Sequence, residues 1–115
     1  MQNYNNLTRT QLLYGSNEEN EVGRQIKYLG GTRVLLHYSK NINNLNNLLD
    51  KIKRSLRLTG LDFVELSEDD AKTPKIDTIF KGIKICREEN VDFVLAVGGI
   101  NEFTIAKLIA VASPY

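Results

Sequence analysis

The sequence is poor in the residues that cross-link a chain or bind metals. Its 115 residues include one cysteine, one histidine, two prolines and no tryptophan. A single cysteine excludes an internal disulfide and favours a reducing compartment, so we expect the cytoplasm. A single histidine, His37, lies within a predicted strand rather than at the spacing of a metal-ligand pair, which favours a structural role for it.

Excess charge and long apolar runs are missing as well. Lys and Arg total 15 against 14 acidic residues, a formal charge of +1, which leaves no basic field for nucleic acid or an anionic membrane. The longest apolar run, residues 105–112, is interrupted by Lys107 and is too short to span a bilayer. The amino terminus lacks the basic and apolar regions of a signal peptide. We therefore expect neither a nucleic-acid partner nor a membrane partner.

The length suits one domain. With 42% hydrophobic residues, a chain of this size can bury one core, and two domains would be unusual. The Asn-rich segment 1–9 has few apolar anchors and is predicted to be a flexible arm. We expect residues 1–115 to form a single domain.

The stretch VDFVLAVGG, residues 91–99, is the strongest local signal. Seven almost entirely apolar residues are typical of a strand buried on both faces, as in the centre of a parallel sheet. Gly98 and Gly99 then allow a tight turn, and an apolar helix follows. A strand, a glycine turn and a helix amino terminus together favour phosphate binding.

The rest of the chain alternates strands and helices. Strands are predicted at 11–14, 33–38, 61–66 and 91–97, and helices at 17–30, 44–58, 73–90 and 102–112. This order predicts an α/β fold, an open Rossmann-like and mostly parallel sheet with helices on both faces, preceded by a short amino-terminal strand or hairpin. The loops 38–42, 67–73 and 98–101 should gather at the carboxyl edge, where such sheets bind ligands.

Apolar spacing predicts which helix faces are buried. The expected stripes are Val22, Ile26 and Leu29; Leu45, Leu48, Leu49, Ile52 and Leu56; and Ile76, Ile79, Phe80 and Ile83. Helix 102–112 has almost no polar face, so we expect it to be covered by a homodimer partner or by a missing carboxyl-terminal domain. The cations Lys51, Lys53, Arg54 and Arg57 are interpreted as a solvated helix face, because they do not form the stripe of a nucleic-acid footprint.

Several of these segments resemble one known family. The run GIKICREENVDFVLAVGG at 82–99, LLYG at 12–15, RVLLHY at 33–38 and the turn at Pro74 are similar, in order and interval, to the amino-terminal domain of the iron-containing alcohol dehydrogenases, in particular the NAD(P)H-dependent butanol dehydrogenase branch. The resemblance covers nearly the whole chain. It implies a nicotinamide cofactor across the strand ends and a metal, iron or zinc, held by a separate helical domain that this sequence does not include.

The resemblance also implies which residues meet the cofactor. Carried over by position, the cofactor-binding candidates are Ser39, Lys40, Thr73, Gly98, Gly99, Asn101 and Thr104, and no catalytic or metal-binding residue is expected in this chain. Ser39 and Lys40 would tolerate a 2′-phosphate, which favours NADP over NAD.

Three cofactor loops depart from the family pattern. The family reads GGGS, then an Asp and a Lys, where this chain has Gly98, Gly99, Ile100 and Asn101, then Thr104 and Lys107. If Ile100 needed a positive φ, its branched side chain would cost about 1–2 kcal/mol. Asn101 could replace the Ser as a helix cap, whereas Thr104 cannot replace the charged Asp. The glycines expected after strand 33–38 are also absent, and Thr73 precedes Pro74 where the family has an Asn. We therefore expect dinucleotide binding to be weak or absent.

Two functions follow from these observations. The first is the NAD(P)-binding domain of an iron-containing alcohol dehydrogenase, truncated, with degenerate cofactor loops and inactive alone. The second is a non-catalytic α/β interaction module that keeps the fold and associates through its apolar carboxyl-terminal helix. Both predict the same architecture.

Overall fold

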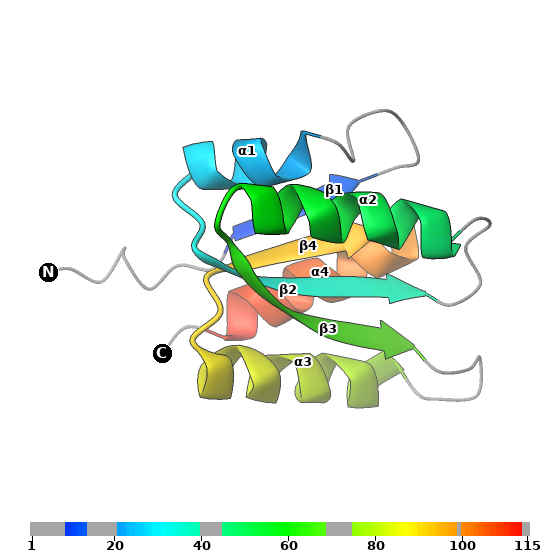
Figure 1. Cartoon of the computed structure of the whole chain (residues 1–115). Coiled ribbons are helices and arrows are strands. Elements are labelled where there is room, and N and C mark those ends of the chain that lie inside the picture. Colours follow the sequence, from blue (N-terminus) through cyan, green and yellow to red (C-terminus); the bar gives the residue numbers. More distant parts are fainter. Residues whose placement is uncertain (1–8, 14–20, 40–44, 69–74, 99, 114–115) are drawn as a thin grey trace, which may run out of the picture.

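The computed structural model describes residues 9–13, 21–39, 45–68, 75–98 and 100–113. They form an α/β domain in which a parallel sheet lies between two layers of helices (Figure 1). The elements alternate along the chain as β1 (Arg9–Leu13), α1 (Val22–Tyr28), β2 (Arg33–Ser39), α2 (Leu45–Leu58), β3 (Asp62–Glu68), α3 (Lys75–Glu89), β4 (Phe93–Val97) and α4 (Ile100–Ala112). The predicted fold class is confirmed.

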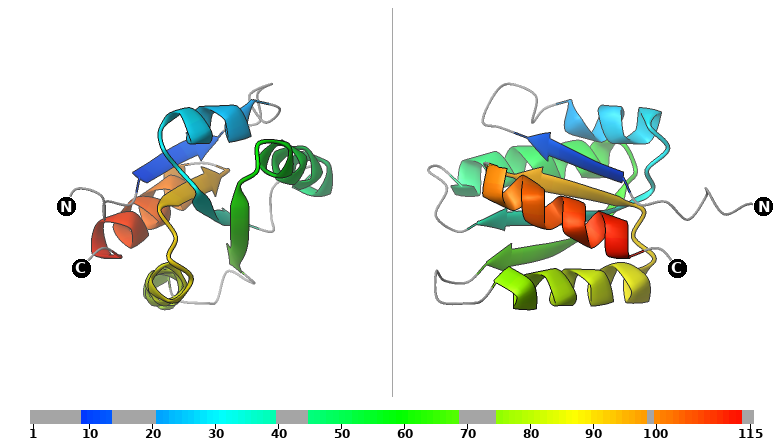
Figure 2. Two further views of the ribbon diagram at one scale, coloured as in Figure 1. Left: turned by 60° about the vertical axis from the view of Figure 1, so that its left-hand side comes forward. Right: turned by 180° about the vertical axis from the view of Figure 1, so that it is seen from behind.

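The strand order β1-β4-β2-β3 explains the two helix layers. The chain moves in one direction across the sheet from β1 to β2 to β3, and then returns to β4. Since parallel crossovers are right-handed, α1 and α2 cover one face while α3 covers the other. Helix α4 lies beside α3 on that second face (Figure 2).

The amino-terminal strand lies at one edge of the sheet. β1 pairs in parallel with β4, from Arg9 opposite Phe93 to Leu13 opposite Val97. The prediction of a short amino-terminal strand is therefore confirmed, and a hairpin partner for it would lie outside the described residues. The predicted flexible arm is wrong at Arg9, which lies in β1, and its other residues, 1–8, lie outside the described part of the chain.

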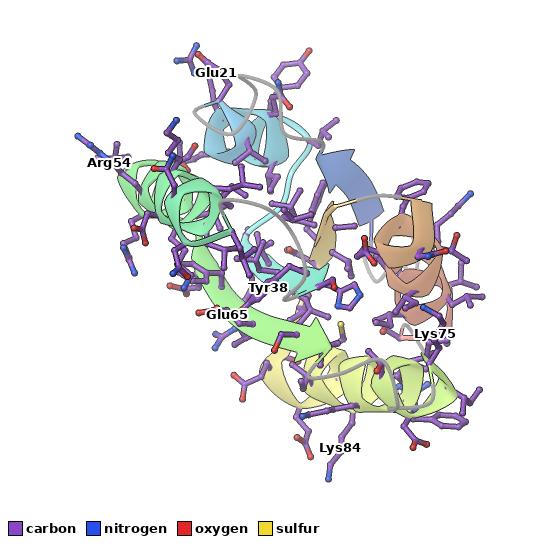
Figure 3. The ribbon with its side chains drawn as sticks, turned by 90° about the vertical axis from the view of Figure 1, so that its right-hand side faces the viewer. Glu21, Tyr38, Arg54, Glu65, Lys75 and Lys84 are labelled. Atoms are coloured by element: carbon purple, nitrogen blue, oxygen red, sulfur yellow. The ribbon has the colours of Figure 1, made fainter. Side chains whose placement is uncertain are left out.

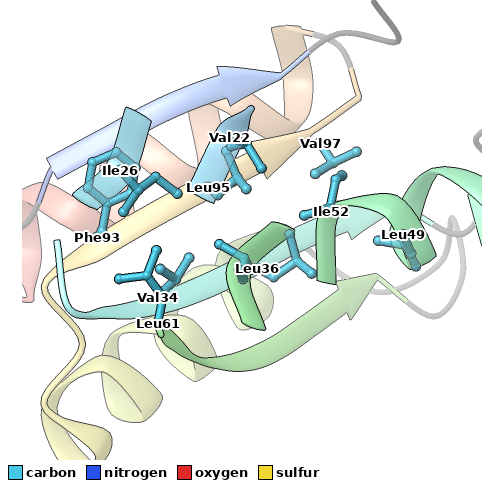
Figure 4. Packing of buried hydrophobic residues seen from close by; sticks show 11 residues of the cluster. Val22, Ile26, Val34, Leu36, Leu49, Ile52, Leu61, Phe93, Leu95 and Val97 are labelled. Atoms are coloured by element: carbon cyan, nitrogen blue, oxygen red, sulfur yellow. The ribbon is translucent and has the colours of Figure 1, made fainter. Parts of the chain in front are cut away.

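Alternation along the central strands creates two cores. Val34 and Leu36 of β2, with Phe93 and Leu95 of β4, point toward α1 and α2 and are fully or almost fully buried (Figure 4). The residues between them point the other way, toward α3 and α4. Every residue of β4 is buried, so the prediction of a central strand buried on both faces is confirmed.

Helices α1 and α2 pack closely because Gly23 has no side chain. A Cβ at this position would overlap the Ser55 carbonyl oxygen and the Thr59 hydroxyl. The backbone N–H of Gly23 donates to Ser55 Oγ at 2.9 Å. The predicted stripe of α2 is confirmed, since Leu49, Ile52 and Leu56 are buried.

Helix α3 is buried along a different line from the predicted one. Its buried positions are Thr78, Gly82 and Cys86, whereas Ile76 and Phe80 are 55% and 63% exposed. The reason is the size of Gly82: its bare backbone lies against the Ile109 side chain of α4, so this side of α3 approaches α4. The predicted stripe of α3 is therefore wrong at Ile76 and Phe80.

A carboxylate joins the amino ends of β4 and β2. Asp92 accepts hydrogen bonds from the Thr32 and Arg33 backbone N–H groups, each at 3.0 Å, and from the Thr32 hydroxyl at 2.6 Å. In return the Asp92 N–H donates to the Arg33 carbonyl. This clamp fixes the two central strands at the edge opposite the predicted cofactor site.

Within the residues that the structure covers, no helix has the length and apolar character needed to cross a bilayer.

Candidate functional site

The candidate site lies where the central strand β4 ends and α4 begins. Gly98 follows β4 directly, and α4 starts two residues later at Ile100. β4 runs between β1 and β2, so this turn opens at the carboxyl edge of the sheet, with the end of β2 beside it. Figure 3 views this edge, with Tyr38 at the end of β2 labelled.

Gly98 has a backbone angle that only glycine adopts freely. Its φ is 136°, which in any other residue brings Cβ against the backbone. The thirteen-residue α4 then presents the unpaired N–H groups of its first turn and the positive end of its dipole. These features suit an anion such as a phosphate group.

The structure changes the interpretation of Ile100 and Asn101. Ile100 is the first residue of α4, and among the described non-glycine residues only Asn90 has a positive φ. The steric cost considered for Ile100 is therefore not incurred. Asn101 is the second residue of the helix, so the prediction that it caps α4 is wrong, although its exposed side chain remains at the helix entrance.

Thr104 and Lys107 lie further along the same helix. Thr104 is exposed one turn after the entrance, where the family motif has a carboxylate. The Lys107 ammonium lies 5.8 Å from the centre of the Phe103 ring, within the range of a cation–π contact. Lys107 is thus held against its own helix.

The other predicted cofactor residues lie on neighbouring loops. Ser39 ends β2 and is half-buried at the same carboxyl edge. Lys40, Thr73 and Gly99 lie outside the described residues, so their roles remain predictions. The structure therefore brings together Gly98, Asn101 and Ser39 at one edge of the sheet.

A polar cluster beside Ser39 was not predicted. The Tyr38 hydroxyl donates to Glu65 Oε1 at 2.9 Å, and Lys53 Nζ lies 3.1 Å from Glu65 Oε2. These contacts connect the end of β2, the middle of β3 and α2 (Figure 3). Spacing could not reveal the cluster, because Tyr38 and Glu65 share a face only once β2 and β3 are paired in register.

The basic face predicted for α2 is only partly solvated. Lys51 and Arg54 are exposed, but Lys53 pairs with Glu65 and the Arg57 guanidinium lies 5.6 Å from the centre of the Phe63 ring. Two of the four cations therefore pack on β3. This arrangement does not form a continuous basic stripe.

The described residues do not fit the metal that the family resemblance implies. His37 is fully buried between the sheet and the α3–α4 layer, with Nδ1 3.1 Å from the Leu66 carbonyl oxygen. No group of three or more His, Cys, Asp or Glu side chains that could hold a metal ion occurs among the residues with described positions. The structural role predicted for His37 agrees with this burial.

Comparison with known proteins gives a consistent result. Residues 9–115 match the family model of iron-containing alcohol dehydrogenases. The NADH-dependent butanol dehydrogenase B of Clostridium acetobutylicum is 36% identical over 106 residues, covering 92% of this chain and 27% of that protein. The NADPH-dependent aldehyde reductase of Escherichia coli is 31% identical over 115 residues, covering 100% of this chain and 28% of that protein.

A solved structure supports the same relationship. The NADH-dependent butanol dehydrogenase A of Thermotoga maritima superimposes with a TM-score of 0.77 at 26% identity, covering 92% of this chain and 26% of that one. The chain therefore spans little more than a quarter of the length of these relatives.

Proposed function

The chain belongs to the iron-containing alcohol dehydrogenase family, and we propose that it is the dinucleotide-binding part of such an enzyme, with altered cofactor loops and no alcohol oxidation of its own. When bound, the nicotinamide supplies a hydride acceptor or donor. The contribution of this chain would be to hold the pyrophosphate. Gly98, the backbone at the start of α4 and Asn101 are the groups that would do so.

The observation that carries the proposal is the positive φ of Gly98. A glycine-specific angle directly after a fully buried central strand, and directly before a long helix, is the local geometry that lets backbone N–H groups approach a phosphate. Ile100 does not oppose it, because its backbone is helical.

Weak binding is nevertheless expected, because of one added carboxylate and one missing hydrogen-bond acceptor. Glu102 lies in the first turn of α4, where its carboxylate interacts with the same positive helix end that a phosphate would use. Thr104 also lacks the carboxylate by which the family Asp could accept a charge-assisted hydrogen bond from a donor group of the cofactor. We expect dissociation constants in the micromolar range or weaker for both NADH and NADPH.

The preference between NAD and NADP rests on the loop after β2. Ser39 and Lys40 carry no negative charge that would repel a 2′-phosphate, which favours NADPH. The relatives include proteins named for NADH and for NADPH, so the binding test compares the two cofactors. A tighter dissociation constant for NADH would contradict this preference.

The proposal is tested with a matched pair of glycine variants. Gly98 and Gly60 both have positive φ, 136° and 77°, but Gly60 follows α2 at the opposite edge of the sheet, and a Cβ there would meet no atom within 4 Å. Alanine should cost about 1–2 kcal/mol of backbone strain at either position. Only Gly98→Ala should weaken dinucleotide binding, by about tenfold.

The measurement is a calorimetric or fluorescence titration of each folded variant with NADH and NADPH. Ile100→Gly is a further variant for this titration. It should leave the affinity for the dinucleotides unchanged, because the backbone of Ile100 is helical and has no strain that a glycine would relieve. Equal loss in Gly98→Ala and Gly60→Ala would contradict the proposed site. Submicromolar affinity in the unmodified chain would show that the altered loops matter less than we infer.

Alcohol oxidation is not expected from the described residues, because none of them forms a metal-binding group. An assay with a primary alcohol, NAD or NADP and added ferrous or zinc ion should give no turnover. The non-catalytic interaction module is the second candidate, and the exposed apolar residues of α3 and α4 favour it. That module needs no dinucleotide, so the absence of any binding at millimolar NADH and NADPH would favour it over the first candidate.

A further inference from the structure

The carboxyl ends of β2 and β4 form a topological switch point of the sheet. β2 leads into α2 on one face, whereas its neighbour β4 leads into α4 on the other face (Figure 2). Open α/β sheets bind ligands where adjacent strands send the chain to opposite faces in this way. Tyr38 is paired with Val97 in the strand register. The residues that follow them, Ser39 and Gly98, therefore lie on the two sides of the switch point.

Tyr38 connects this switch point to α2 and β3. Its half-buried ring packs on the core cluster beneath α1 and α2, as do Leu45 and Leu48 of the first turn of α2. Its hydroxyl donates to Glu65 Oε1 at 2.9 Å, and Lys53 Nζ lies 3.1 Å from Glu65 Oε2. Figure 3 shows Tyr38 and Glu65 on adjacent strands. The end of β2 is therefore fixed by packing on one side and by a charged acceptor on the other.

The acceptor of this hydrogen bond is itself held in place. The side chains of Lys53 and Glu65 are 22% and 36% exposed, so water screens the pair only in part. Hydrogen bonds to an ionised carboxylate are shorter and stronger than those between neutral groups. Lys53 also neutralises Glu65, so the carboxylate does not lie unpaired beside the half-buried Tyr38 ring.

We propose that Tyr38, held by Glu65, is a positioning residue that places Ser39 for the adenosine half of the dinucleotide. The inference rests on the proposed function, in which Gly98 and the start of α4 hold the pyrophosphate and Ser39 lies near the 2′-phosphate. Neither Tyr38 nor Glu65 needs to touch the cofactor, because Ser39 directly follows Tyr38 in the chain. Binding groups are precise only when the residues that support them are locked by packing and hydrogen bonds.

The test is an NMR titration of the full chain with three probes. Adenosine 2′,5′-bisphosphate represents the adenosine half, inorganic pyrophosphate reaches only the Gly98 turn, and NADPH spans both. Tyr38→Phe removes the hydroxyl but keeps the ring, and Glu65→Ala removes its acceptor. Each variant should weaken binding of the bisphosphate and of NADPH by about three- to tenfold. The affinity for pyrophosphate should not change.

Two further variants serve as controls. Glu65→Gln keeps an acceptor for the Tyr38 hydroxyl and should retain the affinity for the bisphosphate within about twofold. Glu89→Ala is the matched control at the opposite edge of the sheet. Glu89 forms an ion pair with Arg33 at 2.8 Å, and its side chain is 45% exposed. Loss of that pair should leave the affinity for all three probes unchanged.

A purely structural role for Tyr38 predicts a different result, namely lower stability and unchanged dissociation constants in the folded chain. Unchanged bisphosphate affinity in Tyr38→Phe or Glu65→Ala would therefore overturn the inference. Equal losses for pyrophosphate and the bisphosphate, or a loss in Glu65→Gln or Glu89→Ala as large as in Glu65→Ala, would overturn it as well. In each of these cases the proposed function stands if Gly98→Ala still weakens NADPH binding. Absence of binding by the unmodified chain to any of the three probes would instead overturn both.

Discussion

The Asp92 clamp provides the sharpest test of how the sheet is held together. Its carboxylate accepts from two backbone N–H groups and one hydroxyl of residues 32 and 33. Asp92→Ala removes all of these acceptors and leaves the partly buried Arg33 N–H without its partner. Hydrogen bonds to charged groups contribute about 1.5–3 kcal/mol each when they are shielded from water. Thr32 is exposed, so water can form hydrogen bonds with its N–H and hydroxyl in the variant and reduce the loss of stability.

We therefore expect Asp92→Ala to lower the free energy of unfolding by about 2–3 kcal/mol. For a domain of this size, that corresponds to a fall in Tm of roughly 10–20 °C. Asp92→Asn keeps one carbonyl acceptor and should lose about half as much. Urea unfolding followed by circular dichroism measures these changes. The slope of the unfolding free energy against urea concentration should be the same in all variants.

Asp62→Ala is the control for the Asp92 variants. Asp62 is an exposed aspartate at the start of β3, opposite Arg33 in the strand register, and its loss should change stability by no more than about 0.5 kcal/mol. A loss below about 0.5 kcal/mol in Asp92→Ala would refute the reasoning, because it would mean that water satisfies both amides. Dinucleotide affinity should not change in any of these folded variants, since the clamp lies at the opposite edge from Gly98.

Two further predictions concern the helix layers. Burial raises the pKa of the Cys86 thiol above its ordinary value of 9.0. The stability that the buried neutral thiol contributes is therefore fully present below pH 9 and is lost as the pH rises beyond that value. Between pH 8 and 10, the urea midpoint should fall more for the unmodified chain than for Cys86→Ala, and equal falls would contradict this assignment. Gly23→Ala should lower the free energy of unfolding by about 1–3 kcal/mol despite the better helix propensity of alanine, because the added Cβ overlaps the backbone of α2. A stabilised variant in the same urea assay would contradict this, because it would show that α1 can move away from α2 at little cost.

Local patterns were sufficient to locate most elements. The predicted helix at 44–58 is α2 at Leu45–Leu58, and the strand at 33–38 is β2 at Arg33–Ser39. Helix α2 has strong apolar periodicity and is followed by Gly60, and β2 is an apolar run that begins soon after Gly30 and Gly31. The strand predicted at 91–97 begins two residues later, at Phe93, because Val91 and Asp92 form the bonded entry to the sheet rather than part of its ladder.

Local patterns could not predict which strands pair or which side of a helix packs against another helix. The strand predicted at 11–14 is β1 at Arg9–Leu13, and its partner β4 lies more than 80 residues away in sequence. No local pattern specifies that pairing. The exposure of Ile76 and Phe80 has a similar origin, since the side of α3 that is buried depends on where α4 packs against Gly82.

The candidate site shows the same limit at the level of a single residue. Comparing GGIN with GGGS identifies Ile100 as a departure, but the backbone angle that makes a glycine necessary is set by where α4 begins. The structure assigns that angle to Gly98 and a helical conformation to Ile100. Weak binding at this turn would therefore reflect the hydrogen-bond acceptor that Thr104 does not supply and the carboxylate of Glu102, rather than backbone strain. It follows that Ile100→Gly would not strengthen dinucleotide binding, whereas removing the negative charge of the first turn, as in Glu102→Gln, would.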